Sequence, residues 1–151
     1  MKTLLQIAKT PVRVSEKTVE ARCDDLVAQI SGRQDVVRFS QARATGQTLG
    51  ISDRRYRAFG RAFWFEVKAE DGKLSREQLE FLGAEHACGE LACCGGVEEL
   101  KTVLTALRIE TERQDHDDFA LDICRRIVQD WQGRGIRGEK SPRKPRKEKT
   151  T

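Results

Sequence analysis

The most hydrophobic stretch of the chain is Ala62–Lys68, which reads Ala-Phe-Trp-Phe-Glu-Val-Lys. Aromatic and branched residues in a short run favour a β-strand, and this run fits a central strand of a sheet. The preceding segment, Ile51–Phe59, is also strand-like, and Phe59-Gly60 separates the two runs. We therefore expect a hairpin of two antiparallel strands, over 51–59 and 61–69, at the centre of the fold.

Two charged residues, Glu66 and Lys68, interrupt this apolar strand. Successive strand residues alternate faces, so both side chains leave on the same side, about 7 Å apart at roughly 3.3 Å per residue. Asp53 lies on the preceding strand, and antiparallel pairing brings it close to Glu66. Because two carboxylates and an ammonium are costly to bury without a partner, these residues indicate a divalent cation. The alternative is an ordinary ion pair at a strand end.

Mg²⁺ prefers one or two carboxylates together with waters and phosphate oxygens. We therefore expect Asp53 and Glu66 to bind Mg²⁺, with Mn²⁺ as a substitute. A bound metal activates water and neutralises charge on a phosphate. Lys68 is expected to stabilise the charge that develops on that phosphate or to orient the attacking water.

The remaining periodic segments set the fold class. In chain order they are a helix over 16–30, a strand over 35–39, a polar loop over 40–49, the hairpin, a helix from Ser75 to about Gly89, a strand over 91–94, a helix from Val97 and a last helix over about 112–132. The order α-β-β-β-α-β-α-α predicts a mixed sheet flanked by helices, in the α/β or α+β class. The expected boundaries are an arm over 1–14, a domain over 15–109, a helix over 110–132 and a disordered basic tail over 133–151.

Three of the helices carry further expectations. Ser15 is a plausible N-cap, and Glu16 and Glu20 project along the apolar face of the helix that it begins. Ser75 and Gln78 match a capping box. The last helix is expected to bury a stripe of Phe119, Ile123, Ile127 and Trp131.

The positive charge is unevenly placed. The chain has a formal net charge of +4, but the last 19 residues hold eight basic and two acidic residues, which leaves the rest slightly acidic. Within that rest, 33–68 contains eight basic and three acidic residues. Basic groups beside a phosphate site favour nucleic acid, although each arginine can instead belong to a solvated face. The candidate DNA-binding residues are Arg38, Arg43, Arg54, Arg55, Arg57 and Lys73.

Five cysteines, with no export signal at the N-terminus, argue against a disulfide framework and favour a cytoplasmic protein of a bacterium or a phage-infected host. No apolar run reaches the roughly 20 residues of a membrane span. His86, Cys88 and Cys93 leave a zinc- or thiol-based regulator as an alternative. Neighbouring strand residues such as Cys93 and Cys94 point to opposite faces, however, so buried free cysteines are favoured.

Four ordered motifs resemble a known family. They are Gly50-Ile51-Ser52-Asp53, Phe65-Glu66-Val67-Lys68, Gly72-Lys73-Leu74-Ser75-x-x-Gln78 and Gly95-Gly96-Val97-Glu98-Glu99-Leu100. Over residues 15–107 the chain resembles the virus-type replication-repair nuclease (VRR-NUC) domain of the PD-(D/E)xK superfamily. The resemblance implies a restriction-endonuclease-like core and metal-dependent hydrolysis of DNA, often branched or flapped DNA, in replication, recombination or repair.

The resemblance also implies roles for particular residues. Asp53 and Glu66 match the metal ligands of the family, and Lys68 matches its catalytic lysine. Gln78 matches a glutamine of the site, and Glu16 matches a helix glutamate better than Glu20 does. The Arg-Arg-Tyr that follows Asp53 departs from the apolar residue usual in the family.

Other classes of function stay open at this point. A catalytically silent DNA-binding module with the same fold would also explain the basic residues. A homodimer is expected if the substrate is a symmetric junction, because two cuts then need two sites related by a two-fold axis.

Overall fold

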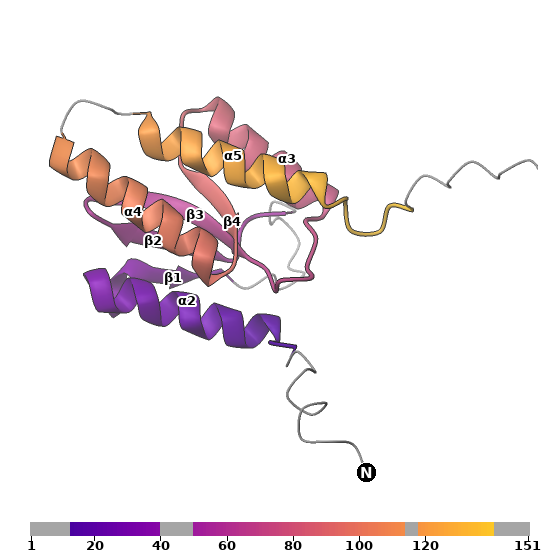
Figure 1. Ribbon diagram of the computed structural model, residues 1–151, viewed down its shortest axis with the longest axis horizontal. Coiled ribbons are helices and arrows are strands. Elements are labelled where there is room, and N and C mark those ends of the chain that lie inside the picture. The colour runs from indigo at the N-terminus through magenta and orange to yellow at the C-terminus, as the bar shows by residue number, and fades with distance from the viewer. Residues whose placement is uncertain (1–12, 40–49, 114–117, 141–151) are drawn as a thin grey trace, which may run out of the picture.

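The structure is a computed structural model, and it describes residues 13–39, 50–113 and 118–140. Its elements are α2 (Glu16–Ser31), the 3-10 turn η1 (Arg33–Asp35), β1 (Val36–Arg38), β2 (Arg54–Ala58), β3 (Arg61–Val67), α3 (Arg76–Ala87), β4 (Ala92–Gly95), α4 (Val97–Arg113) and α5 (Phe119–Gly133). This order of helices and strands confirms the expected mixed α/β composition (Figure 1). The expected loop over 40–49 lies outside the described residues.

The four strands form one mixed sheet in the order β1-β2-β3-β4. Strands β1, β2 and β3 are antiparallel neighbours, and β4 pairs parallel to β3. The expected hairpin is confirmed, and both residues of its turn, Phe59 and Gly60, have positive φ (52° and 74°). Two such residues suit the right-handed twist of a tight hairpin.

Helices cover both faces of the sheet (Figure 1). Phe63 and Phe65 of β3 pack with α2 and α4, whereas Trp64, between them in sequence, packs with α3 and the end of α5. The cysteines of β4 divide in the same way, with Cys93 in the first cluster and Cys94 in the second. The strand alternation expected from the sequence is therefore confirmed, and it assigns Glu66 and Lys68 to the α3 side.

The last two helices differ from the expectation. Helix α4 continues to Arg113 and α5 begins at Phe119, so the expected start of the last helix at about 110–112 is wrong. The buried residues of α5 are Ala120, Leu121, Cys124, Val128 and Trp131, and Phe119 is 38% exposed. Trp131 of the expected stripe is buried, and Ile123 and Ile127 are partly buried against the core. The buried face is nevertheless centred one residue further along, because the small side chains of Ala120 and Cys124 let α5 lie close to α4 and β4. No helix in the described ranges is long and apolar enough to cross a membrane.

Residues 134–140 pack against the domain, so disorder from 133 onward was the wrong expectation for this segment. The Arg137 amide donates to the Leu74 carbonyl at 2.8 Å, and the Arg134 guanidinium donates to the Glu70 carbonyl at 3.0 Å. Arg134 also lies over the Trp131 ring, 3.8 Å from its centroid. The free carbonyls between β3 and α3 and the flat face of Trp131 supply the partners that the charge pattern did not reveal. The rest of the tail, 141–151, lies outside the described residues.

Candidate active site

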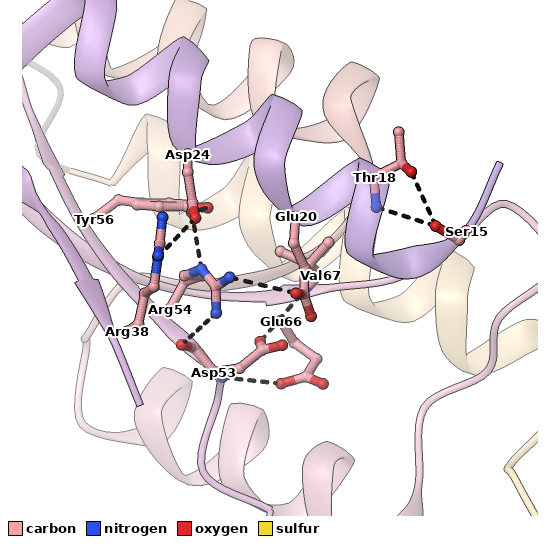
Figure 2. A network of polar contacts seen from close by, with 10 residues as sticks. All are labelled: Ser15, Thr18, Glu20, Asp24, Arg38, Asp53, Arg54, Tyr56, Glu66 and Val67. Carbon is pink, nitrogen blue, oxygen red and sulfur yellow. Dashed lines mark hydrogen bonds and ion pairs between the residues drawn. The ribbon is translucent and has the colours of Figure 1, made fainter. Parts of the chain in front are cut away.

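The carboxylates of Asp53 and Glu66 come together where β2 begins and β3 ends. The backbone amide of Asp53 donates to Glu66 Oε2 at 3.3 Å, and the amide of Val67 donates to Asp53 Oδ1 at 3.4 Å (Figure 2). Pairing of Arg54 with Phe65 across the two strands sets this approach. The expectation that antiparallel pairing brings Asp53 close to Glu66 is confirmed.

Lys68 and Gln78 meet the same carboxylate. Lys68 Nζ lies 3.3 Å from Glu66 Oε1, and Gln78 Nε2 donates to that oxygen at 2.5 Å. Glu66 and Lys68 are each only 2% exposed. Lys68 also lines a pocket of about 800 Å³ that includes Arg22 and Arg134. The four polar groups thus form one cluster, in which Glu66, Lys68 and Gln78 are buried and Asp53 is half-buried, with an opening on the side of Lys68.

Gln78 serves two structures at once. Its side-chain oxygen accepts from the backbone amide of Ser75 at 2.9 Å, and the backbone amide of Gln78 donates to Ser75 Oγ at 3.1 Å. These two bonds complete the capping box of α3. Its Nε2 group remains free for Glu66. The cap fixes the first turn of the helix, and the helix in turn aims the amide at Glu66. Both interpretations of Gln78 from the sequence are therefore compatible.

Burial, together with the nearby Asp53 carboxylate, raises the pKa of the Glu66 carboxyl to about 8, although the Lys68 ammonium acts in the opposite direction. The ionised form of Glu66 is thus costly in the metal-free protein. A divalent cation between the two carboxylates would remove that cost, because it favours the ionised form. The electrostatics of the pair therefore suit a cation.

The protein supplies only some of the ligands that Mg²⁺ or Mn²⁺ needs. Within 13–39, 50–113 and 118–140, no three His, Cys, Asp or Glu side chains are placed to hold a metal ion together. Two carboxylates are nevertheless a normal protein contribution for Mg²⁺, which takes its other ligands from waters and substrate phosphates. Asp53 and Glu66 are the residues that would hold it.

Helix α2 contributes Glu20, and not Glu16, to this region. Glu20 Oε2 lies 3.5 Å from Arg54 Nη2 (Figure 2). Burial raises the pKa of Glu20, Arg54 lowers it, and Asp53 raises it again. Glu16 instead lines a pocket with Asp71 at the end of β3. The geometry favours Glu20, which matched the helix glutamate of the family less well than Glu16 did.

Asp24, one helical turn beyond Glu20, is a buried carboxylate that the sequence reasoning missed. Its Oδ1 accepts from Arg54 Nε and from the Tyr56 hydroxyl, each at 2.8 Å, and its Oδ2 accepts from Arg38 Nε at 3.0 Å. Asp24 is 5% exposed and Tyr56 is fully buried. The spacing of Glu16, Glu20 and Asp24 by four residues was the available signal, since it places three carboxylates along one side of the helix.

Arg54 therefore belongs to the interior and does not present its side chain to DNA. It is 7% exposed, and although burial lowers the pKa of the guanidinium, the hydrogen bond and charge of Asp24, with the nearby Tyr56 and Asp53, together raise it. This corrects the expectation that Arg54 contacts a phosphate. The physical reason is that Asp24 meets it across the gap between α2 and β2.

The other candidate DNA-binding residues are distributed as follows. The side chains of Arg38 and Arg57 are 67% and 62% exposed, and Arg57 pairs with Asp35 at 3.6 Å. The Arg55 guanidinium lies over the Trp64 ring, 4.7 Å from its centroid. Lys73 is exposed, and Arg43 lies outside the described residues. Arg38, Arg57 and Lys73 thus remain available to a polyanion.

The three residues of the alternative zinc site, His86, Cys88 and Cys93, do not come together. His86 Nε2 lies 2.6 Å from the Ala92 carbonyl oxygen, Cys88 is exposed, and Cys93 is buried on the other side of the sheet from Cys94. The arrangement gives no support to a zinc site built from His86, Cys88 and Cys93.

Gly50 lies against the first turn of α3. It has φ of +78°, and a Cβ placed there would be 2.2 Å from the Glu77 carbonyl oxygen and 2.7 Å from the Gln78 nitrogen. Gly50→Ala is therefore expected to push α3 away from Asp53 and to lower the free energy of unfolding by about 2–3 kcal/mol. Urea denaturation measures this loss.

Gly60→Ala is the matched control for that substitution. Gly60 also has positive φ (+74°), but a Cβ there meets no atom within 4 Å. Its expected cost is the backbone strain alone, about 1 kcal/mol. Equal losses in the two variants would show that the close approach of Gly50 to α3 does not matter.

Comparisons of the chain with protein-family models, with curated proteins and with solved structures found no match. The interpretation of the site therefore depends on the contacts described above and on the four motifs of the sequence.

Proposed function

We propose that the protein is a metal-dependent endonuclease of the VRR-NUC type, within the PD-(D/E)xK superfamily, that hydrolyses phosphodiester bonds of branched or structured DNA. The observation that carries the proposal is the meeting of the half-buried Asp53 with the buried Glu66, Lys68 and Gln78 in one cluster. Two carboxylates, an ammonium and an amide from four separate positions converge there. A solvent-exposed ion pair would need neither this burial nor the amide.

Each side chain has a role that follows from its contacts. A divalent metal, when bound by Asp53 and Glu66, supplies an activated water and neutralises negative charge on the phosphate. Gln78 and Lys68 hold Glu66 in one orientation through its Oε1 atom. The Lys68 ammonium, which lies 3.3 Å from Glu66 Oε1, stabilises the negative charge that develops on the phosphate oxygens. Burial of the cluster strengthens each of these interactions because it lowers the local dielectric.

Substrate binding is assigned to exposed basic residues of the described chain. Arg38, Arg57 and Lys73 are exposed, and a polyanion gains affinity from such groups by releasing counterions. The basic tail adds to the same sequence-independent attraction. Binding is thus expected to weaken steeply with salt, and branched DNA with several backbones near one site is the preferred ligand.

A cleavage assay on labelled linear, flap and four-way DNA tests the proposal. We expect cutting in Mg²⁺ or Mn²⁺ and none in EDTA. Lys68→Met keeps the length of the side chain and is expected to slow cutting about 100-fold. Lys101→Met, on the exposed side of α4, is the control and should cut like the wild-type protein. Cleavage that persists in EDTA, or that is unchanged in Lys68→Met, would refute the mechanism.

One observation favours a silent DNA-binding module as the second candidate. The carboxylate of Glu66 already accepts from three groups, since Oε1 meets Lys68 and Gln78 and Oε2 meets the Asp53 amide. Such a carboxylate can be satisfied without a metal. This candidate predicts salt-sensitive binding of the same DNA panel with no cutting in any metal.

A further inference from the structure

All three side-chain nitrogen atoms of Arg54 contact other groups of the protein. Nε donates to Asp24 Oδ1 at 2.8 Å, Nη1 donates to the Asp53 carbonyl at 3.1 Å, and Nη2 lies 3.5 Å from Glu20 Oε2 (Figure 2). The guanidinium is planar, so fixing one edge fixes the direction of the other donors. A single side chain thus connects the buried carboxylate of α2 to Asp53, the residue that immediately precedes β2.

Asp24 holds the guanidinium in this orientation. Arg54 binds Oδ1 and Arg38 binds Oδ2, so these two arginines fix the plane of the carboxylate, and the Tyr56 hydroxyl is an additional donor to Oδ1. Figure 2 shows Asp24 reaching down from α2 to these three partners. Asp24 and Arg54 are both less than one tenth exposed.

The backbone of Asp53 is held on both sides. Its carbonyl accepts from Arg54 and from the Phe39 amide at 2.9 Å, and its amide donates to Glu66. Its side-chain Oδ1 accepts from Val67. A change in Arg54 therefore moves Asp53 relative to the end of β3.

A purely stabilising role does not explain this arrangement. A buried ion pair contributes little net stability compared with apolar side chains of the same size. What Arg54 supplies, and an apolar residue does not, is a pair of directed donors for the Asp53 carbonyl and for Glu20. Groups that orient metal ligands in this manner change metal affinity by about 10- to 100-fold when they are removed.

We propose that Arg54, oriented by Asp24, is a positioning residue that sets the Asp53 carboxylate and Glu20 for cation binding. The inference rests on the proposed function as far as the cation is concerned. It assigns to the Arg54–Asp24 pair a part in the site and removes Arg54 from the DNA-binding surface.

Two measurements on Arg54→Lys test the proposal, with Tyr56→Phe as the matched control. Lysine keeps the charge but cannot reach Asp24, Asp53 and Glu20 together. Tyr56→Phe removes a hydrogen bond from the same Asp24 oxygen and leaves Arg54 in place. The first measurement is Mn²⁺ binding by calorimetry, and the second is the amide resonance of Val67, whose N–H bonds to Asp53 Oδ1.

We expect Arg54→Lys to bind Mn²⁺ at least 10-fold more weakly than the wild-type protein and to shift the Val67 resonance, while Tyr56→Phe changes neither. Unchanged Mn²⁺ affinity and an unchanged Val67 resonance in folded Arg54→Lys would overturn the proposal. If Arg54→Lys does not fold, Arg54→Gln, which retains a side-chain amide donor, takes its place with the same expectations.

The two proposals fail in different ways. A wild-type protein that binds no Mn²⁺ and cuts no DNA refutes the nuclease function. The Val67 resonance then decides the positioning role by itself: a shift confined to the Arg54 variant supports it, and no shift overturns it. If the wild-type protein cuts DNA, and the Arg54 variant has the same Mn²⁺ affinity and the same Val67 resonance as the wild-type protein, only the positioning role is refuted.

Discussion

Glu66→Gln is expected to abolish DNA cleavage, by about 10³-fold or more, and to stabilise the metal-free protein at neutral pH. The two effects have one cause. Glu66 is 2% exposed and lies beside Asp53, and its pKa is raised to about 8 from a usual value of 4.5. Glutamine keeps the shape and the bond to Gln78 but carries no charge, so it removes both the metal ligand and the cost of burying it.

The pH dependence of stability follows from the direction of this shift. The native state holds the Glu66 proton between pH 4.5 and about 8, whereas the unfolded state has released it. The contribution of Glu66 to stability is therefore complete below pH 4.5 and is lost as pH rises toward 8. The loss approaches about 1.4 kcal/mol per pH unit in this range.

Urea denaturation in EDTA at pH 5.5 and pH 7.5 measures the effect. Between pH 5.5 and pH 7.5, the free energy of unfolding of Glu66→Gln is expected to rise by about 2 kcal/mol relative to that of the wild-type protein. Mg²⁺ should restore the wild-type protein at pH 7.5 and leave the variant unchanged. Glu98→Gln, whose side chain is 85% exposed, is the control and should follow wild type. Parallel behaviour of Glu66→Gln and wild type would show that Glu66 is not a high-pKa group.

The part of the site that depends on local pattern was predictable from the sequence. Alternation along 61–69 placed Glu66 and Lys68 on one side of β3, and the hairpin brought Asp53 to them. The capping box located Gln78 at the start of α3. These features depend on spacings of a few residues, for which strand and helix geometry leaves little choice.

The part that depends on how elements pack was not predictable. The spacing of Asp24 from Glu20 places both carboxylates on one side of α2, but it does not reveal which residues cover them. The partners of Asp24 lie 14, 30 and 32 residues away, at Arg38, Arg54 and Tyr56. A charged side chain is ordinarily assigned to the surface. The choice between Glu16 and Glu20 has the same origin, because it depends on where α2 crosses the sheet.

Asp24→Ala is expected to lower the free energy of unfolding by about 3–5 kcal/mol. The substitution leaves the Arg54 guanidinium and the Tyr56 hydroxyl buried without their acceptor, since these groups are 7% and 0% exposed. The cost of an uncompensated buried charge exceeds that of the cavity. Urea denaturation at pH 7 measures the loss.

An apolar replacement of the whole cluster separates stability from function. The triple variant Asp24→Leu, Arg54→Met and Tyr56→Phe buries no unpaired polar group at these three positions, so it is expected to recover most of the stability lost in Asp24→Ala. Asp53 keeps the Phe39 amide on its carbonyl, and Glu20 is partly exposed to water. DNA cleavage and Mn²⁺ affinity are expected to stay low in this variant, because no side chain then directs Asp53 and Glu20. Recovery of both stability and Mn²⁺ affinity would show that the buried ion pair serves folding alone.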